Sequence, residues 1–288
     1  MAKNNNLGDF LKGLADKFRS KLSTTAKINP QDFEGKVDEV YTKGFNEGGS
    51  AGFEEGYLVG ESAGKQEAYD TFWDTFQKNG SRTDYQYAFS SPGWTNDNFK
   101  PKYNIVSWFG SSACMFRGSG ISGSLKEILQ NLGITLSFIQ GPDRAYGAAD
   151  IFQWTQFTEL PVIDLSLANG ENCLFRTFSG CTKLHTIEKL IMPDSCPSYG
   201  TQTFENDYSL KNIDFGGTIK YTLSFQWSPL TADSMKNIFD HLDTAEYGGT
   251  RTITVKTSTK TAYDEKYGDW DTRIAQLTSS GNWTFTLS

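Results

Sequence analysis

"FSGCTKLHTIEKL", residues 178–190, decides the fold, because its pattern recurs in two other segments of the chain. These segments are "WTQFTELPVIDL", which begins at Trp154, and "FENDYSLKNIDF", which begins at Phe204. The successive starting residues are 24 and 26 positions apart. In each copy an aromatic residue is followed by Leu and then by Ile: Trp154, Leu160 and Ile163; Phe178, Leu184 and Ile187; Phe204, Leu210 and Ile213. Self-similarity at a nearly fixed period indicates a repeat architecture.

Each copy predicts a short β-strand whose inward side chains pack against the equivalent residues of the next copy. One copy cannot bury its own apolar face, whereas three stacked copies can. The form F-x-x-C-x-x-L-x-x-I is complete at Phe178, Cys181, Leu184 and Ile187, and it resembles the bacterial surface-protein type of leucine-rich repeat. The resemblance implies that Cys181 is a small buried residue between neighbouring turns of the chain. The Asn or Cys usual after the strand is missing and three copies are clear, so we expect a short arc rather than a full horseshoe.

Acidic residues follow the inward Ile of each copy. Because side chains alternate along a strand, we expect Asp164, Glu188 and Asp214 to point outward. Adjacent strands lie about 4.8 Å apart, so carboxylates in register would repel one another. The three residues form either a solvated acidic face or a ligand-binding ladder that meets a cation or a basic partner surface.

The segments on both sides of the repeats predict further helices and strands. "SGSLKEILQNLGITLSFI" predicts a helix over 124–132, stopped by Gly133, and a strand over 134–139. After the repeats, "SPLTADSMKNIFDHLDT" predicts a helix capped by Thr231 or Asp233, and "RTITVKT" predicts a strand. "DWDTRIAQLTSSGNWTFTL" adds a last helix and strand, so we expect a helix-and-strand cap that continues the sheet.

Glycine recurs every four residues upstream of the repeats, at Gly44, Gly48, Gly52, Gly56, Gly60 and Gly64. On a helix, a step of four turns about 400°, so these glycines would form one slowly drifting ribbon. Each glycine costs an isolated helix ~1 kcal/mol relative to alanine, which close contacts with neighbouring chains could recover. The pattern favours a homo-oligomer, for which we expect a trimer. A flexible glycine-rich tether is the alternative.

The N-terminal segment has the apolar stripe of an amphipathic helix, formed by Leu7, Phe10, Leu11, Leu14 and Phe18. This helix either packs against its own domain or docks on a partner, and a membrane-surface helix is the weakest of the three interpretations. A second helix begins near Asn29 and Pro30. Tyr69, Phe72, Trp73 and Phe76 form the packing face of a further helix, which Asn79 and Gly80 end.

These patterns predict a multi-part α+β protein. We expect a helical anchor and oligomerisation region over residues 1–79 and a connecting segment over 80–120. A short leucine-rich-repeat solenoid with its caps would then occupy residues 121–288.

Charge and composition narrow the classes of partner. The formal net charge of the 288 residues is −7, which disfavours nucleic acid and anionic membranes, because both require clustered Lys and Arg. No window approaches the ~18 apolar residues of a membrane helix, and no secretory signal precedes the first helix. The four cysteines include no C-x-x-C pair and there are two histidines, so we expect buried free thiols, no metal site and no cofactor.

Enzymatic motifs are missing. The chain has no G-x-S-x-G, P-loop, G-x-G-x-x-G or H-E-x-x-H motif. A polysaccharide-degrading enzyme would need two carboxylates in a cleft, for which Asp143 or Asp150 with Glu159 are candidates that no spacing singles out. We therefore expect a binding protein with no catalytic residues.

The whole layout resembles a group of phage and prophage proteins. The motifs that carry this resemblance are "INPQDFEGKVDEVY", the glycine-every-four segment, "YDTFWDTFQKNG" and the repeats. It implies a structural component of a virion, such as a tail-associated or fibre-like protein, made in the host cytoplasm. Its N-terminal helices would contact other virion proteins, and its repeat domain would face outward to attach to a host-surface protein or glycan. A bacterial surface adhesin is the alternative, although it would need an export signal or anchor.

Overall fold

The computed structural model describes residues 6–29, 32–33, 35–37, 39–40, 67, 70–109, 112–140, 147–168, 172–193, 202–245 and 249–288. The chain divides into two compact units, Met1–Thr75 and Phe76–Ser288. The six glycines from Gly44 to Gly64 lie outside the described residues, and so do the side chains of Leu7 and Phe10. The predicted oligomerisation ribbon therefore stays a prediction.

The first unit begins with the predicted amphipathic helix, α1 (Asn6–Leu22). Leu11, Leu14 and Phe18 on its stripe are half-buried. The ring of Phe18 lies 5.5 Å from that of Phe33, measured between centroids. Residues 33, 35–37 and 39–40 are helical. Phe18 of the apolar stripe therefore packs against a residue of its own unit.

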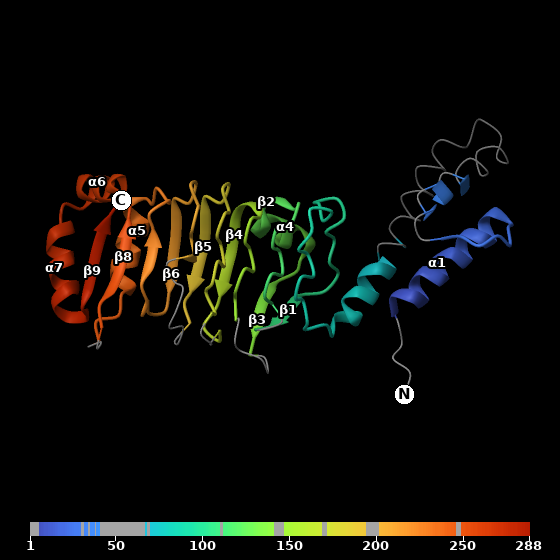
Figure 1. Ribbon diagram of the computed structural model, residues 1–288, viewed down its shortest axis with the longest axis horizontal. Coiled ribbons are helices and arrows are strands. Elements are labelled where there is room, and N and C mark those ends of the chain that lie inside the picture. Colours follow the sequence, from blue (N-terminus) through green and yellow to red (C-terminus); the bar gives the residue numbers. More distant parts are fainter. Residues whose placement is uncertain are drawn as a thin grey trace. The chain divides into compact units, whose positions relative to one another are not determined.

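The second unit is built on parallel strands that follow one another side by side in chain order along most of its length (Figure 1). The strands are β1 (Ile105–Trp108), β2 (Ser122–Ser124), β3 (Leu136–Ile139), β4 (Gln156–Asp164), β5 (Thr186–Ile191), β6 (Asn212–Gly216), β7 (Leu223–Phe225), β8 (Arg251–Val255) and β9 (Trp283–Leu287). The helices of this unit are η2 (Lys78–Gly80), α4 (Leu125–Leu132), α5 (Ala232–His241), α6 (Thr257–Lys266) and α7 (Trp270–Gly281).

Every pairing between these strands is parallel. The sheets have the orders β1-β3, β2-β4-β5-β6 and β7-β8-β9. Parallel neighbours need a crossover connection between them. From β4 to β5 and from β5 to β6, the chain makes one crossover per repeat. The protein is therefore a mixed α and β structure with parallel sheets.

A column of stacked phenylalanines runs through the core of this unit. Phe152 and Phe178 stack with centroids 5.6 Å apart, and Phe178 and Phe204 with centroids 5.3 Å apart. Each of these steps spans 26 residues. The full phenylalanine column is Phe89, Phe116, Phe152, Phe178, Phe204 and Phe225. We call each stretch from one column residue to the next a coil.

The column extends the repeat in both directions and corrects the alignment of its first copy. Phe152, rather than the predicted Trp154, stacks on Phe178. Leu160 is paired with Ile187, and Ile163 is paired with Leu190. The aromatic position moves by two residues and the strand positions move by three. Phe157, Leu160 and Ile163 in β4 recur at steps of three, so the shift preserves the apolar pattern of the strand. The predicted alignment of Ile163 with Ile187 is therefore wrong, because Leu160 is the residue that pairs with Ile187.

Reverse turns carry the chain past each column residue, and their backbones form a second hydrogen-bonded ladder. The amides of Asp150, Phe152 and Trp154 donate to carbonyls of the next coil at 2.9 to 3.0 Å. Two rows of residues with positive φ flank the column. The first left-handed row is Tyr87, Cys114, Asp150 and Arg176; the second left-handed row is Gly118, Trp154, Gly180 and Asn206.

The two helices that flank the repeats were predicted, and the structure shows their caps. Ser124 Oγ accepts a hydrogen bond from the amide of Glu127 at the start of α4, and Gly133 ends this helix with a φ of 66°. Thr231 caps α5, so Thr231 rather than Asp233 is the N-cap. Helix α6 was not predicted, because its sequence has almost no apolar stripe.

The cysteines differ in part from the prediction of free thiols. Cys114 and Cys181 are free and buried. The thiol of Cys181 donates to the carbonyl oxygen of Phe152 at 2.9 Å, which places it between coils as expected. Cys173 is disulfide-bonded, so the prediction was wrong for this residue. Cys196 lies outside the described residues.

Candidate functional site

Charged and polar side chains meet along the first left-handed row. The thiol of Cys114 points to Asp150 Oδ2 at 3.9 Å, and Arg176 Nε donates to Gln202 Oε1 at 3.3 Å. The hydrogen-bonded turns place these side chains on successive coils, because the amides of Cys114 and Asp150 donate to the carbonyl oxygen of the residue just before the next row position. We call Cys114, Arg117, Asp150 and Arg176 the arginine–carboxyl cluster.

Burial shifts the pKa values of two groups in this cluster. It raises the pKa of the Asp150 carboxyl, while the guanidinium groups of Arg117 and Arg176 oppose that rise. Burial also raises the pKa of the Cys114 thiol, and the nearby Asp150 adds to this effect. Because the thiolate is the nucleophilic form, Cys114 is held in its unreactive form. The cluster is therefore suited to binding rather than to covalent chemistry.

Trp154 lies beside this cluster on the second left-handed row. Its side chain is 52% exposed, although the rest of its coil is largely buried. The guanidinium carbon of Arg117 lies 4.9 Å from the centroid of the indole ring. A Cβ added to Gly180 would lie 2.3 Å from Trp154 Cδ1. The indole thus rests against the bare backbone of the next coil.

The predicted acidic ladder is not in register. Asp164 is paired with Ile191, whereas Ile187, which precedes Glu188, is paired with Leu160. Ile213 is paired with Ile187, so Asp214 lies next to the bulge that contains Glu188. All three carboxylates are exposed as predicted. The three-carboxylate ladder is wrong because it depended on the shifted frame of the first copy.

Glu188 has a cationic neighbour in place of a carboxylate ladder. Lys126 Nζ from α4 lies 3.4 Å from Glu188 Oε2 and 3.9 Å from Glu159 Oε1. Ser124 Oγ also donates to Glu159 Oε2 at 3.0 Å. Glu159 therefore contacts Ser124 and Lys126 on the strand face, while Asp150 lies on the first left-handed row. These two candidate acids are not brought together as a pair, and Asp143 lies outside the described residues.

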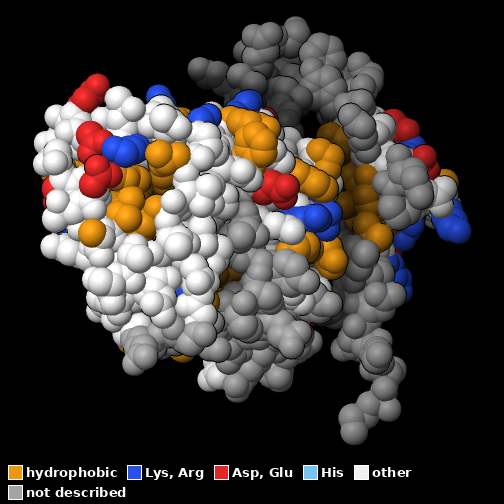
Figure 2. Space-filling view, turned by 60° about the vertical axis from the view of Figure 1, so that its left-hand side comes forward, with side chains coloured by type: hydrophobic (Ala, Val, Ile, Leu, Met, Phe, Trp, Pro, Cys, Tyr) orange, Lys and Arg blue, Asp and Glu red, His pale blue; other side chains and the backbone are white. Residues whose placement is uncertain are grey.

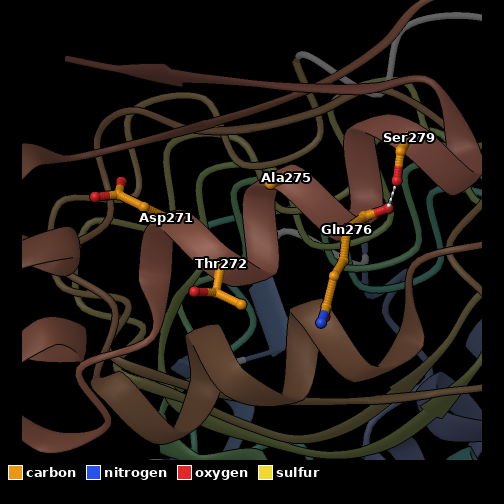
Figure 3. A pocket seen from close by; sticks show the side chains of 5 residues that line it. All are labelled: Asp271, Thr272, Ala275, Gln276 and Ser279. Atoms are coloured by element: carbon orange, nitrogen blue, oxygen red, sulfur yellow. Dashed lines mark hydrogen bonds between the residues drawn. The ribbon is translucent and has the colours of Figure 1, made fainter.

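A shallow hollow on α7 is a weaker candidate. Its lining residues all come from one face of this helix: Asp271, Thr272, Ala275, Gln276 and Ser279 (Figure 3). The contact drawn between them is the hydrogen bond from Ser279 Oγ to the carbonyl oxygen of Gln276, at 2.9 Å. One carboxylate among neutral side chains supplies no acid–base pair.

Metal and membrane sites find no support in the part of the chain that the structure describes. Within it, no group of three or more His, Cys, Asp or Glu side chains is arranged to hold a metal ion. No described helix has the length and apolarity needed to span a bilayer. In Figure 2, hydrophobic side chains form separate patches, and acidic and basic side chains lie close to one another rather than in one continuous charged band.

Comparisons with known proteins identify no relative. No family model matches the chain, and neither the curated proteins nor the solved structures gave a match.

Sequence reasoning missed the arginine–carboxyl cluster, although a signal for the turn rows is present. Two positions after the four central column residues, Phe116, Phe152, Phe178 and Phe204, stand Gly118, Trp154, Gly180 and Asn206. Gly and Asn are the residues that tolerate positive φ, so their recurrence at this position indicates a left-handed backbone conformation. Trp154 is the one residue of that row that is neither Gly nor Asn, and its aromatic side chain is exposed.

Proposed function

We propose that the protein is a displayed binding component of a phage virion. In this proposal residues 76–288 form a leucine-rich-repeat solenoid, and the N-terminal helices attach it to other virion proteins and to further copies of the chain. The solenoid surface would contact the host cell. The function is adhesion, with no catalytic step.

The observation that carries the binding function is the regular surface of the turn ladder. Stacked coils place equivalent side chains in rows. Arg176 lies on the first left-handed row and Trp154 on the second, and Arg117 lies over the Trp154 ring. Trp and Arg are the residues that most often dominate binding energy at protein interfaces. Repeat proteins use such extended surfaces for recognition.

The disulfide at Cys173 supports display outside a reducing compartment. Disulfides persist in extracellular and virion-surface proteins and are rare in the cytosol, where thiols are kept reduced. A chain made in a host cytoplasm and then carried on a released particle would form this bond after release. A bacterial surface adhesin would meet the same oxidising conditions, so the disulfide does not separate the two settings.

The proposal is tested on particles and on cells. Antibodies against the full chain should label purified virions from a lysogen that carries the gene, and mass spectrometry of those virions should detect the chain. The labelled full-length protein should also bind intact low-GC Gram-positive cells. Absence from purified virions would overturn the virion assignment, and failure to bind any tested host would overturn the adhesion role.

A further inference from the structure

Trp154 occupies a backbone position that disfavours it. Its φ is 59°, and the equivalent residues on neighbouring coils are Gly118, Gly180 and Asn206, with φ of 63°, 75° and 63°. A bulky residue in this region is an outlier, and such outliers concentrate at functional sites. Nothing in the turn itself requires an indole, because glycine serves on the coils before and after.

The surroundings hold the indole at the surface. Gly180 leaves room beneath Trp154 that any Cβ would fill, since that atom would lie 2.3 Å from Trp154 Cδ1. Arg117 lies 4.9 Å from the ring centroid on the preceding coil. About half of the side chain nevertheless stays exposed, at 52%. The ring is thus positioned by its neighbours and open to a ligand.

Two guanidinium groups lie around the Asp150 turn. Arg117 lies over the indole ring, and Arg176 follows Phe175, whose carbonyl oxygen accepts from the amide of Asp150. Among the described residues neither arginine forms a salt bridge, and both guanidinium groups lower the pKa of the Asp150 carboxyl. Arg176 also lies 4.6 Å from the ring centroid of Phe175, which fixes its direction. The two arginines outnumber the single carboxyl, so the cluster attracts an anion.

We propose that Trp154, Arg117 and Arg176 form a binding site for an acidic saccharide. A pyranose ring presents a flat set of C–H groups that stacks on the negative face of an indole, and a uronate carboxylate accepts the paired N–H donors of arginine. The half-exposed indole leaves ring surface on which a saccharide ring can stack. This inference rests on the proposed adhesion function and names its ligand class.

The experiment measures binding of the full-length protein to polygalacturonate, with neutral dextran and poly-glutamate as comparison polymers. The test variant is Trp154→Gly, which removes the ring and places glycine where the neighbouring coils already have it. Asn206→Gly is the matched control, because it makes the same change in the same row away from the arginines. Arg117→Gln and Arg176→Gln test the charges, and circular dichroism verifies folding of every variant.

We expect polygalacturonate binding that weakens with added salt, and dextran binding that is much weaker. Trp154→Gly should weaken polygalacturonate binding about tenfold and each arginine variant several-fold, whereas Asn206→Gly should change it less than about twofold. Equal binding by Trp154→Gly and the unaltered protein, or no polygalacturonate binding at all, would overturn the proposal. Poly-glutamate binding that is lost in Trp154→Gly would overturn the saccharide assignment in favour of an acidic peptide.

Attachment to cells separates this inference from the proposed function. If the unaltered protein and Trp154→Gly attach to host cells equally, the saccharide site is wrong and the adhesion function stands. If neither attaches but only the unaltered protein binds polygalacturonate, the saccharide site stands and the adhesion function fails.

Discussion

Phe152 and Phe178 stack almost parallel, with ring planes 4° apart and centroids separated by 5.6 Å. Phe204 stacks on the other face of Phe178 at 5.3 Å. Both faces of the central ring are therefore covered by identical residues of the neighbouring coils. Removing that ring would open a cavity that no side chain of the same coil can fill.

Truncation of the central ring should be strongly destabilising. Phe178→Ala is expected to lower the free energy of unfolding by about 3–5 kcal/mol, because it removes a fully buried aromatic side chain and leaves a cavity. Phe178→Leu should cost less, since it keeps most of the volume. Urea denaturation of the full chain measures both. Tyr208→Ala, at a side chain that is 51% exposed, is the control and should change stability by under about 1 kcal/mol.

The contact between Gly180 and Trp154 should appear as a coupling between two substitutions. Gly180 has a φ of 75°, and an added Cβ would lie 2.3 Å from Trp154 Cδ1. Gly180→Ala is therefore expected to destabilise the fold by about 1–3 kcal/mol. Trp154→Gly removes the clash but not the cost of the positive φ, so it should recover part of the loss.

A double-mutant cycle of these two substitutions, followed by thermal or urea unfolding, measures the coupling. We expect an interaction energy of about 0.5–3 kcal/mol. Strict additivity of the two changes would show that the indole does not rest on Gly180.

Asp207 should make stability depend on pH. Its side chain is fully buried, and Oδ1 accepts a hydrogen bond from the amide of Cys181 at 2.9 Å. Burial raises the pKa of this carboxyl well above its ordinary value. The folded state therefore keeps a proton that the unfolded state has lost. The resulting stabilisation is full below the unfolded pKa of about 4 and is lost as the pH rises through the folded pKa.

Asp207→Asn should flatten this dependence, because the amide oxygen can still accept from Cys181 while the group no longer titrates. Unfolding free energies measured from pH 4 upwards should fall with pH in the unaltered protein by up to about 1.4 kcal/mol per unit for this one group. They should fall less in the variant. Asp214→Asn, at an exposed carboxylate, is the control and should leave the slope in place. An unchanged slope in Asp207→Asn would contradict the assignment.

Arg251 should be essential to the C-terminal cap. Its side chain is 2% exposed, pairs with Asp243 Oδ2 at 3.0 Å and donates to the carbonyl oxygen of Ala245 at 3.2 Å. Its guanidinium carbon lies 4.5 Å from the ring centroid of Trp283. Arg251→Met is expected to cost about 3–5 kcal/mol, because it leaves the carboxylate and the carbonyls without their donor.

Unfolding by guanidinium chloride, followed through tryptophan fluorescence, measures this loss. The matched control is Lys236→Met, which breaks an exposed pair with Asp240 and should cost under about 1 kcal/mol. Equal effects of the two substitutions would show that the buried pair is dispensable.

Much of the fold was predictable because its elements have local signals. The spacing of apolar residues indicated the parallel strands, and Ser124 with Gly133 marked both ends of α4. The frame of the first copy was not predictable, because Phe157, Leu160 and Ile163 satisfy two alignments equally well. Hydrogen bonding between coils, which depends on residues far apart in the sequence, selects the frame in the folded chain.

The candidate site depended even more on contacts between distant segments. Cys114, Asp150 and Arg176 are separated by 36 and 26 positions, and no local motif joins them. The acidic ladder failed for a related reason, since a shift of three residues in β4 moves Asp164 away from Glu188. Positions within one coil can be assigned from sequence, but neighbours across coils require the register.

The constant step of 26 residues between Phe152, Phe178 and Phe204 has an evolutionary consequence. Because each ring meets the same type of ring above and below it, duplication or deletion of one such step leaves compatible surfaces on both sides of the join. Unequal recombination could therefore lengthen or shorten the stack of coils in fixed increments without requiring a new core. The surface residues of an added step would be free to diversify.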